Sequence, residues 1–193
     1  TEQAHVGTYN GRTYLYASDF ITDNDPTAPE TVAEEFIVGS IDLTNPNSIP
    51  TEIAVGVVGF ETPDSVVAAA TGTANYTGVG VMAFISANTY NTADMQANFA
   101  VNFTNSTISG SVDIDDPLTN PSTYNFATVN VPQTALTGNG FSAQPTVTVN
   151  NPGGNTYTFN NETINGTFYG DNSEVLAGVL SADYTENGAP GVA

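Results

Sequence analysis

The chain has 193 residues, of which 39% are hydrophobic and only 11% charged, and a single arginine stands against 20 aspartates and glutamates, for a net charge of −19. Such a chain cannot displace counterions from phosphates, so nucleic acids and anionic membranes are excluded as partners. The nine tyrosines and ten phenylalanines supply enough apolar surface for a folded core, which argues against disorder. The absence of cysteine excludes disulfides and thiol chemistry.

The first 70 residues are predicted to form a small β-rich unit. Residues 6–16 are typical of a hairpin, because Asn10-Gly11 is the pair that best tolerates positive φ in a two-residue turn. An acidic, proline-containing loop at residues 22–31 is followed by expected strands at residues 36–43 and 53–60. Residues 32–36 fit a short helix or the start of a strand. Residues 61–70 have the composition of a linker, which predicts domains at 1–70 and 71–193.

The second part shows strand-like alternation punctuated by Gly, Asn and Pro. Evenly spaced antiparallel strands with short turns favour a barrel or a sandwich. A closed barrel also removes exposed strand edges, which are usually guarded by lysine, and this chain has no lysine. The expected strands are residues 73–86, 95–103, 107–114, 124–131, 140–150, 156–159, 163–169 and 178–184.

Two stretches of this part carry distinctive motifs. Residues 72–78 read Gly-Thr-Ala-Asn-Tyr-Thr-Gly, and residues 166–170 read Gly-Thr-Phe-Tyr-Gly and are followed by residues 172–180. The first stretch resembles the opening strand, and the second the closing signature, of the β-barrels of transferrin-binding protein B. The resemblance implies an all-β fold, an up-and-down antiparallel barrel of about eight strands preceded by a β-rich handle region. It also implies a surface lipoprotein or secreted protein of a Gram-negative bacterium that binds transferrin, haem or a regulatory protein.

His5 is the one imidazole of the chain and the one candidate for a cofactor ligand. The resemblance to haem-binding relatives implies that it could be an axial haem ligand. We favour the alternative, a surface histidine near the N-terminus. A catalytic triad is not supported, because the sequence alone puts no nucleophile and orienting acid in a known geometry around this histidine.

Two acidic clusters suit Ca²⁺, which prefers hard oxygen ligands supplied by loops. Neither has the glycine and distal glutamate of an EF-hand, so a solvated acidic turn is the alternative. The candidate metal ligands are Asp113, Asp115 and Asp116 at the end of one strand, and Asp23 and Asp25 in the N-terminal loop.

Four tyrosines that flank predicted turns are candidates for partner binding, because tyrosine is enriched at interfaces. They are Tyr9, Tyr14, Tyr16 and Tyr90. Core or cross-strand packing is the alternative role, and it is the one we expect for Tyr76 and Tyr169.

The sequence favours a non-enzymatic protein that works outside the cytoplasm, on the outer-membrane surface or in the medium. Its carboxylates lie mostly in turns, and basic groups that stabilise developing charge are nearly absent. The first hypothesis is a binding protein that captures a nutrient ligand or a partner protein. The alternative is a self-associating structural subunit of an extracellular filament, sheath or surface layer. The sequence leaves open the ligand, and whether the chain is lipid-anchored or secreted.

Overall fold

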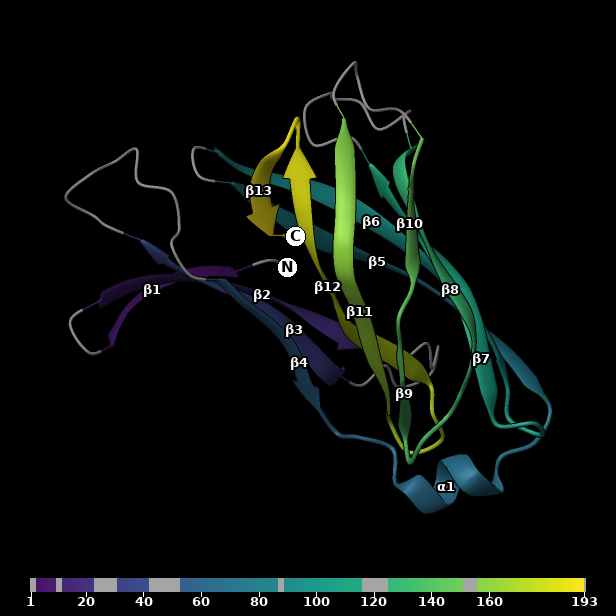
Figure 1. The fold of residues 1–193 in the computed structure, drawn as a ribbon. Coiled ribbons are helices and arrows are strands. Elements are labelled where there is room, and N and C mark those ends of the chain that lie inside the picture. The colour runs from purple at the N-terminus through teal and green to yellow at the C-terminus, as the bar shows by residue number, and fades with distance from the viewer. Residues whose placement is uncertain are drawn as a thin grey trace.

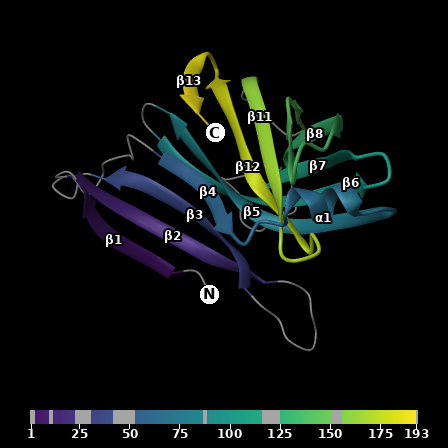
Figure 2. The ribbon, with the colours of Figure 1, turned by 90° about the horizontal axis from the view of Figure 1, so that it is seen from below.

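The protein is all-β, with two antiparallel sheets and one short helix (Figure 1). The computed structural model describes residues 3–9, 12–22, 31–41, 53–86, 89–115, 125–150 and 156–192. A four-stranded sheet from the first part of the chain lies beside a larger nine-stranded sheet, with β1 farthest from the larger sheet and β4 nearest to it (Figures 1 and 2). None of the helices in the described ranges has the length and hydrophobicity needed to cross a membrane.

The four-stranded sheet is a simple meander in the order β1-β2-β3-β4. Its strands are β1 (Gln3–Tyr9), β2 (Arg12–Thr22), β3 (Thr31–Ile41) and β4 (Ile53–Gly59). Tyr9 lies opposite Arg12, which confirms the predicted hairpin, although residues 10 and 11 lie outside the described residues. Residues 32–36 are strand rather than helix, because β3 finds ladder partners on both of its sides, in β2 and in β4.

The larger sheet contains the strands predicted for the second part, together with an unpredicted bulge and an unpredicted last strand. Its neighbours follow the order β10-β8-β7-β6-β5-β13-β12-β11-β9, and every pairing is antiparallel. The strands are β5 (Thr73–Ser86), β6 (Thr89–Asn102), β7 (Thr107–Asp115), β8 (Asn125–Ala135), β9 (Gly140–Ala143), β10 (Thr146–Val149), β11 (Tyr157–Tyr169), β12 (Val175–Glu186) and β13 (Ala189–Val192).

The two ends of this sheet are joined by one bent segment. β9 pairs with β11, β10 pairs with β8, and only Gln144 and Pro145 separate β9 from β10. Proline has no N–H for a ladder, so it suits the point where the segment changes partners. If β9 and β10 are counted as one strand, each of the eight strands pairs with a neighbour on both sides, as expected for an up-and-down barrel.

Two local features were not predicted. The expected strands 156–159 and 163–169 are one strand, β11, with a bulge between Asn160 and Thr163 where Asn161 has a φ of 55°. The chain also turns once more after β12, at Asn187-Gly188, where φ is 50° and 86°, and forms β13. An Asn-Gly pair with positive φ at both residues is the preferred two-residue hairpin turn.

The core of the barrel is filled mainly by aromatic and β-branched side chains. Phe168 is fully buried, and its ring lies 5.6 Å from those of both Tyr76 and Phe103. Phe84 makes edge contacts with Phe126 and Tyr184 at 6.0 and 5.7 Å. Helix α1 (Asp64–Ala69) forms within the predicted linker and adds its buried Val67 to the same core.

Candidate ligand-binding surface

The first two strands bring most of the predicted binding residues onto one face. His5 lies opposite Tyr16, Gly7 opposite Tyr14, and Tyr9 opposite Arg12. Alternate residues of a strand share a face, and directly opposed residues share it as well. We call this set, His5, Tyr9, Arg12, Tyr14 and Tyr16, the aromatic face.

Ile21, Ala33 and Val57 occupy the face of the four-stranded sheet opposite to these positions, as the register of β2, β3 and β4 shows. At one end of the sheet these three residues pack in a small cluster with Tyr169 and Val175 of the barrel. Contact with the barrel at this end therefore uses the aliphatic face.

The chain between β4 and α1 fixes the sheet to the barrel through backbone hydrogen bonds. The N–H of Thr62 donates to the carbonyl of Phe168 at 2.8 Å, and the N–H of Gly170 donates to the carbonyl of Phe60 at 2.9 Å. The hydroxyl of the fully buried Thr62 donates to the carbonyl of Gly170 at 2.7 Å. These bonds form an isolated antiparallel bridge between Glu61 and Tyr169, at the end of β11.

Tyr169 lies in the middle of this junction and is 4% exposed. Burial raises the pKa of its hydroxyl, and the nearby Glu61 carboxylate raises the pKa further, while a hydrogen bond with Thr167 lowers it. The ring is therefore neutral across the physiological range. Its role is packing between the two sheets, as the sequence predicted for this residue.

The aromatic face combines the residue types that suit protein surfaces and flat ring ligands. Tyrosine offers a large apolar area together with a hydroxyl, at low cost in side-chain entropy. Arg12 is the only arginine of a chain with a net charge of −19, and it lies opposite Tyr9 in the register. His5 adds the one imidazole, directly opposite Tyr16.

The other sequence candidates lie elsewhere. Tyr90 is on β6 opposite Ile85, in the other sheet, so it is not part of the aromatic face. Asp113 and Asp115 lie on the outer side of β7, since Val112 and Ile114 between and beside them are buried, and Asp113 accepts a hydrogen bond from Thr128 at 2.9 Å.

The Ca²⁺ interpretation of the acidic clusters stays a prediction. Asp116, Asp23 and Asp25 lie outside the described residues. Within the described ranges, no three His, Cys, Asp or Glu side chains come together in a metal-binding group.

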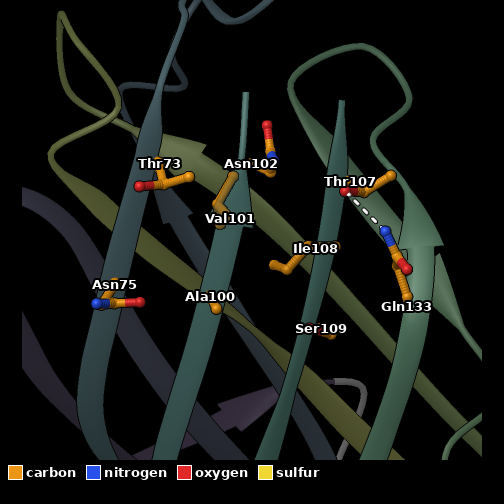
Figure 3. A pocket seen from close by; sticks show the side chains of 9 residues that line it. All are labelled: Thr73, Asn75, Ala100, Val101, Asn102, Thr107, Ile108, Ser109 and Gln133. Atoms are coloured by element: carbon orange, nitrogen blue, oxygen red, sulfur yellow. Dashed lines mark hydrogen bonds between the residues drawn. The ribbon is translucent and has the colours of Figure 1, made fainter. Parts of the chain in front are cut away.

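A polar depression on the outside of the barrel was not predicted. It has a volume of about 450 Å³ and spans β5 to β8 (Figure 3). Neutral hydrogen-bonding side chains and apolar groups contribute about equally to its surface, and Gln133 donates to the hydroxyl of Thr107 at 3.2 Å. The lining residues are Thr73, Asn75, Ala100, Val101, Asn102, Thr107, Ile108, Ser109 and Gln133. In the sequence, these outward Thr and Asn residues are indistinguishable from an ordinary solvated strand face.

The comparisons with known proteins concern the barrel. The family model described as the C-lobe and N-lobe β-barrels of Tf-binding protein B matches residues 69–193, which is more than half of the chain. No curated protein matches the chain in a sequence search.

Proposed function

Because this chain belongs to the family of the transferrin-binding protein B β-barrels, we propose that it is a non-enzymatic binding protein that captures its ligand through the aromatic face. We place it on the outer-membrane surface of a Gram-negative bacterium or in its medium. The barrel serves as the rigid support, and the four-stranded sheet presents the recognition residues.

One observation carries this proposal. The register of β1 and β2 puts three of the four candidate tyrosines, the sole histidine and the sole arginine at positions that share one face of the sheet. Tyrosine and arginine are the residues most often found at the energetic centre of protein interfaces.

Two ligand classes agree with this face. A protein partner is the first, because the family is named for binding transferrin. Haem is the second, because its flat ring stacks on tyrosine, and His5, which lies opposite Tyr16 in the register, is the candidate axial ligand.

The test uses iron-loaded transferrin and hemin as probes, with surface plasmon resonance and Soret absorption as readouts. We expect Tyr14→Thr combined with Tyr16→Thr to weaken binding of the responding probe at least tenfold, since each truncated hot-spot residue costs about 1–2 kcal/mol. Threonine keeps the β-propensity, so the sheet is retained.

The control, Thr148→Ala with Thr158→Ala, changes two exposed residues of the barrel and should bind as the parent does. Equal loss in both variants would contradict the proposal.

A structural subunit is the second candidate, and the edges of the four-stranded sheet favour it. Among the described residues, β1 and β4 each have a strand partner on one side only. The chain has no lysine to guard such edges against pairing with another copy. Electron microscopy over a range of salt and Ca²⁺ concentrations decides this: ordered filaments or sheets support a subunit, and dispersed particles under all conditions rule it out.

A further inference from the structure

The depression on the outside of the barrel forms where short side chains are surrounded by longer ones. The register puts Ala100 of β6 between Asn75 of β5 and Ser109 of β7, and Ala100 has the shortest side chain of this row. The next row along the strands is polar throughout and consists of Thr73, Asn102 and Thr107. The volume of about 450 Å³ falls within the range of about 300–1,000 Å³ that is usual for small-molecule sites.

A β-bulge borders the depression on the side of β8. In the pairing of β7 with β8, Ser109 alone lies opposite two residues, Pro132 and Gln133. A bulge of this kind redirects a side chain from its regular position. Here Gln133 reaches β7, where its side-chain amide donates to the hydroxyl of Thr107 at 3.2 Å (Figure 3). The bulge therefore places a long polar side chain at the border of the depression.

The hydrogen-bonding groups around the depression keep capacity for a ligand. Asn102 accepts a hydrogen bond from the backbone N–H of Asn105 at 3.0 Å through its Oδ1, which orients the side chain and leaves the Nδ2 group to donate. The hydroxyl of Thr107 accepts from Gln133, so its own proton can be donated. The Oε1 atom of Gln133 is an acceptor beside it. Donors and acceptors thus alternate along this border.

The depression is neutral, although the chain has 20 aspartates and glutamates. None of its nine lining residues is ionisable. The neutral character continues in the following row, which consists of Thr77, Asn98, Ser111 and Asn130. A cationic ligand would find no ion pair in the depression, and an anionic ligand would be repelled by the net charge of −19. The surface therefore suits an uncharged ligand.

We propose that the depression binds a neutral oligosaccharide. Saccharide hydroxyls both donate and accept hydrogen bonds, so they match a surface of amides and hydroxyls. The C–H groups of a pyranose ring find an apolar counterpart at Ala100, because apolar groups contribute about half of the surface. A peptide strand is disfavoured, since β6 and β7 already have partners on both sides and offer no free edge. The site does not involve the aromatic face, so it stands or fails separately from the proposed function.

Three neutral trisaccharides, maltotriose, cellotriose and triacetylchitotriose, test this proposal with the intact, isotope-labelled chain. We expect at least one of them to cause saturable shifts of backbone amide signals in NMR, centred on residues 73–75, 100–102 and 107–109, with β1 and β2 unchanged. Trigalacturonate has the same length but carries three carboxylates, and it should bind at least tenfold more weakly than the best neutral probe. No saturable shift with any neutral probe, shifts confined to other regions, or equal binding of trigalacturonate would each overturn the proposal.

The variant Ala100→Ile provides the decisive comparison. The position is exposed and isoleucine favours strands, so the fold is retained while the larger side chain fills the floor of the depression. We expect at least a tenfold loss of affinity for the responding trisaccharide. The matched control, Thr158→Ile, introduces the same side chain at an exposed position of β11 outside the depression and should leave the affinity unchanged.

A second variant, Gln133→Ala, removes the side chain that the bulge directs toward β7. We expect a loss of affinity of about three- to tenfold, as for one or two neutral hydrogen bonds. Gln133 is exposed, so folding does not depend on it. Affinity equal to that of the parent chain in either Ala100→Ile or Gln133→Ala would overturn the proposal.

Discussion

The barrel and the four-stranded sheet are both antiparallel, but they are stabilised differently. The barrel surrounds a continuous core in which Phe168 is fully buried and seven aromatic pairs lie within about 6 Å of each other. The four-stranded sheet shares only a small cluster with the barrel, around Ala33 and Tyr169 at one of its ends. The register puts Tyr9, Tyr14 and Tyr16 of this sheet on the face opposite to that cluster.

The two regions therefore have different roles in the proposed function. Aromatic side chains inside the barrel contribute to the free energy of folding, whereas the tyrosines of the four-stranded sheet are the proposed ligand contacts. A region with few buried contacts opens at lower free energy than a closed core, and binding surfaces are often drawn from such regions. The predictions below test how far the two regions differ.

The largest expected effect is on the barrel. Phe168→Ala removes a fully buried ring that contacts Tyr76 and Phe103, so we expect a loss of about 3–5 kcal/mol in the free energy of unfolding. Urea unfolding followed by tyrosine fluorescence measures it. The matched control, Phe60→Ala, removes a ring that is 79% exposed and should stay within about 0.5 kcal/mol of the parent. Similar losses in the free energy of unfolding for Phe168→Ala and Phe60→Ala would contradict the conclusion that the barrel core supplies most of the stability.

A smaller effect is expected at the junction. Tyr169→Ala empties the centre of the cluster that joins the sheets, and we expect a cost of about 2–3 kcal/mol, mainly to docking of the four-stranded sheet. Cleavage by thermolysin within residues 1–60 should become faster while the barrel stays intact. Thermolysin is required because Arg12 is the only basic cleavage site for trypsin. Tyr169→Phe keeps the ring and serves as the control; a cleavage pattern identical for both variants would show that the sheet is held elsewhere.

The smallest effect is expected from alkaline pH. Burial, and then the charge of Glu174, raises the pKa of Tyr76 from 10.0 to about 12. The folded state therefore holds this proton more tightly than the unfolded state, so the contribution of Tyr76 is complete below pH 10 and is lost as pH rises toward 12. Since Tyr76 is partly exposed, we expect the loss to be about 1–2 kcal/mol after solvent screening.

Tyr76→Phe isolates this contribution. The variant should lose less stability than the parent between pH 10 and 12 in urea unfolding, because it lacks the hydroxyl that donates to the carbonyl of Ser173 and ionises in this range. Absorption at 295 nm follows the phenolates directly. If parent and variant lose stability equally over this interval, Tyr76 does not titrate as stated.

Much of the barrel could be predicted from the sequence, because each strand has a strong local signal. The strand at residues 73–86 agrees at both ends with β5, and the alternation at residues 107–114 agrees with β7 within one residue. The changes of partner could not be predicted in this way. The bend at Pro145 and the bulge at Asn161 depend on which strands come together, which local alternation does not specify.

For the candidate surface, the sequence predicts only the local register. The Asn10-Gly11 pair predicts the hairpin of β1 and β2, whose register puts Tyr9, Tyr14 and Tyr16 at positions that share a face, and their part in binding stays a prediction. Tyr90 has the same local signal but belongs to the other sheet, which only the assembled fold reveals.

Native-state amide exchange tests the central claim, that the barrel is the stable support and the aromatic face of the four-stranded sheet is the recognition surface. It should be measured residue by residue on the free chain and on its complex with whichever probe, transferrin or hemin, is bound. We expect β6, β7 and β11 to exchange only by global unfolding, and β1 and β2 to exchange faster in the free chain and to become protected in the complex. Equal protection of both regions in the free chain, with no gain at β1 and β2 on binding, would contradict the account.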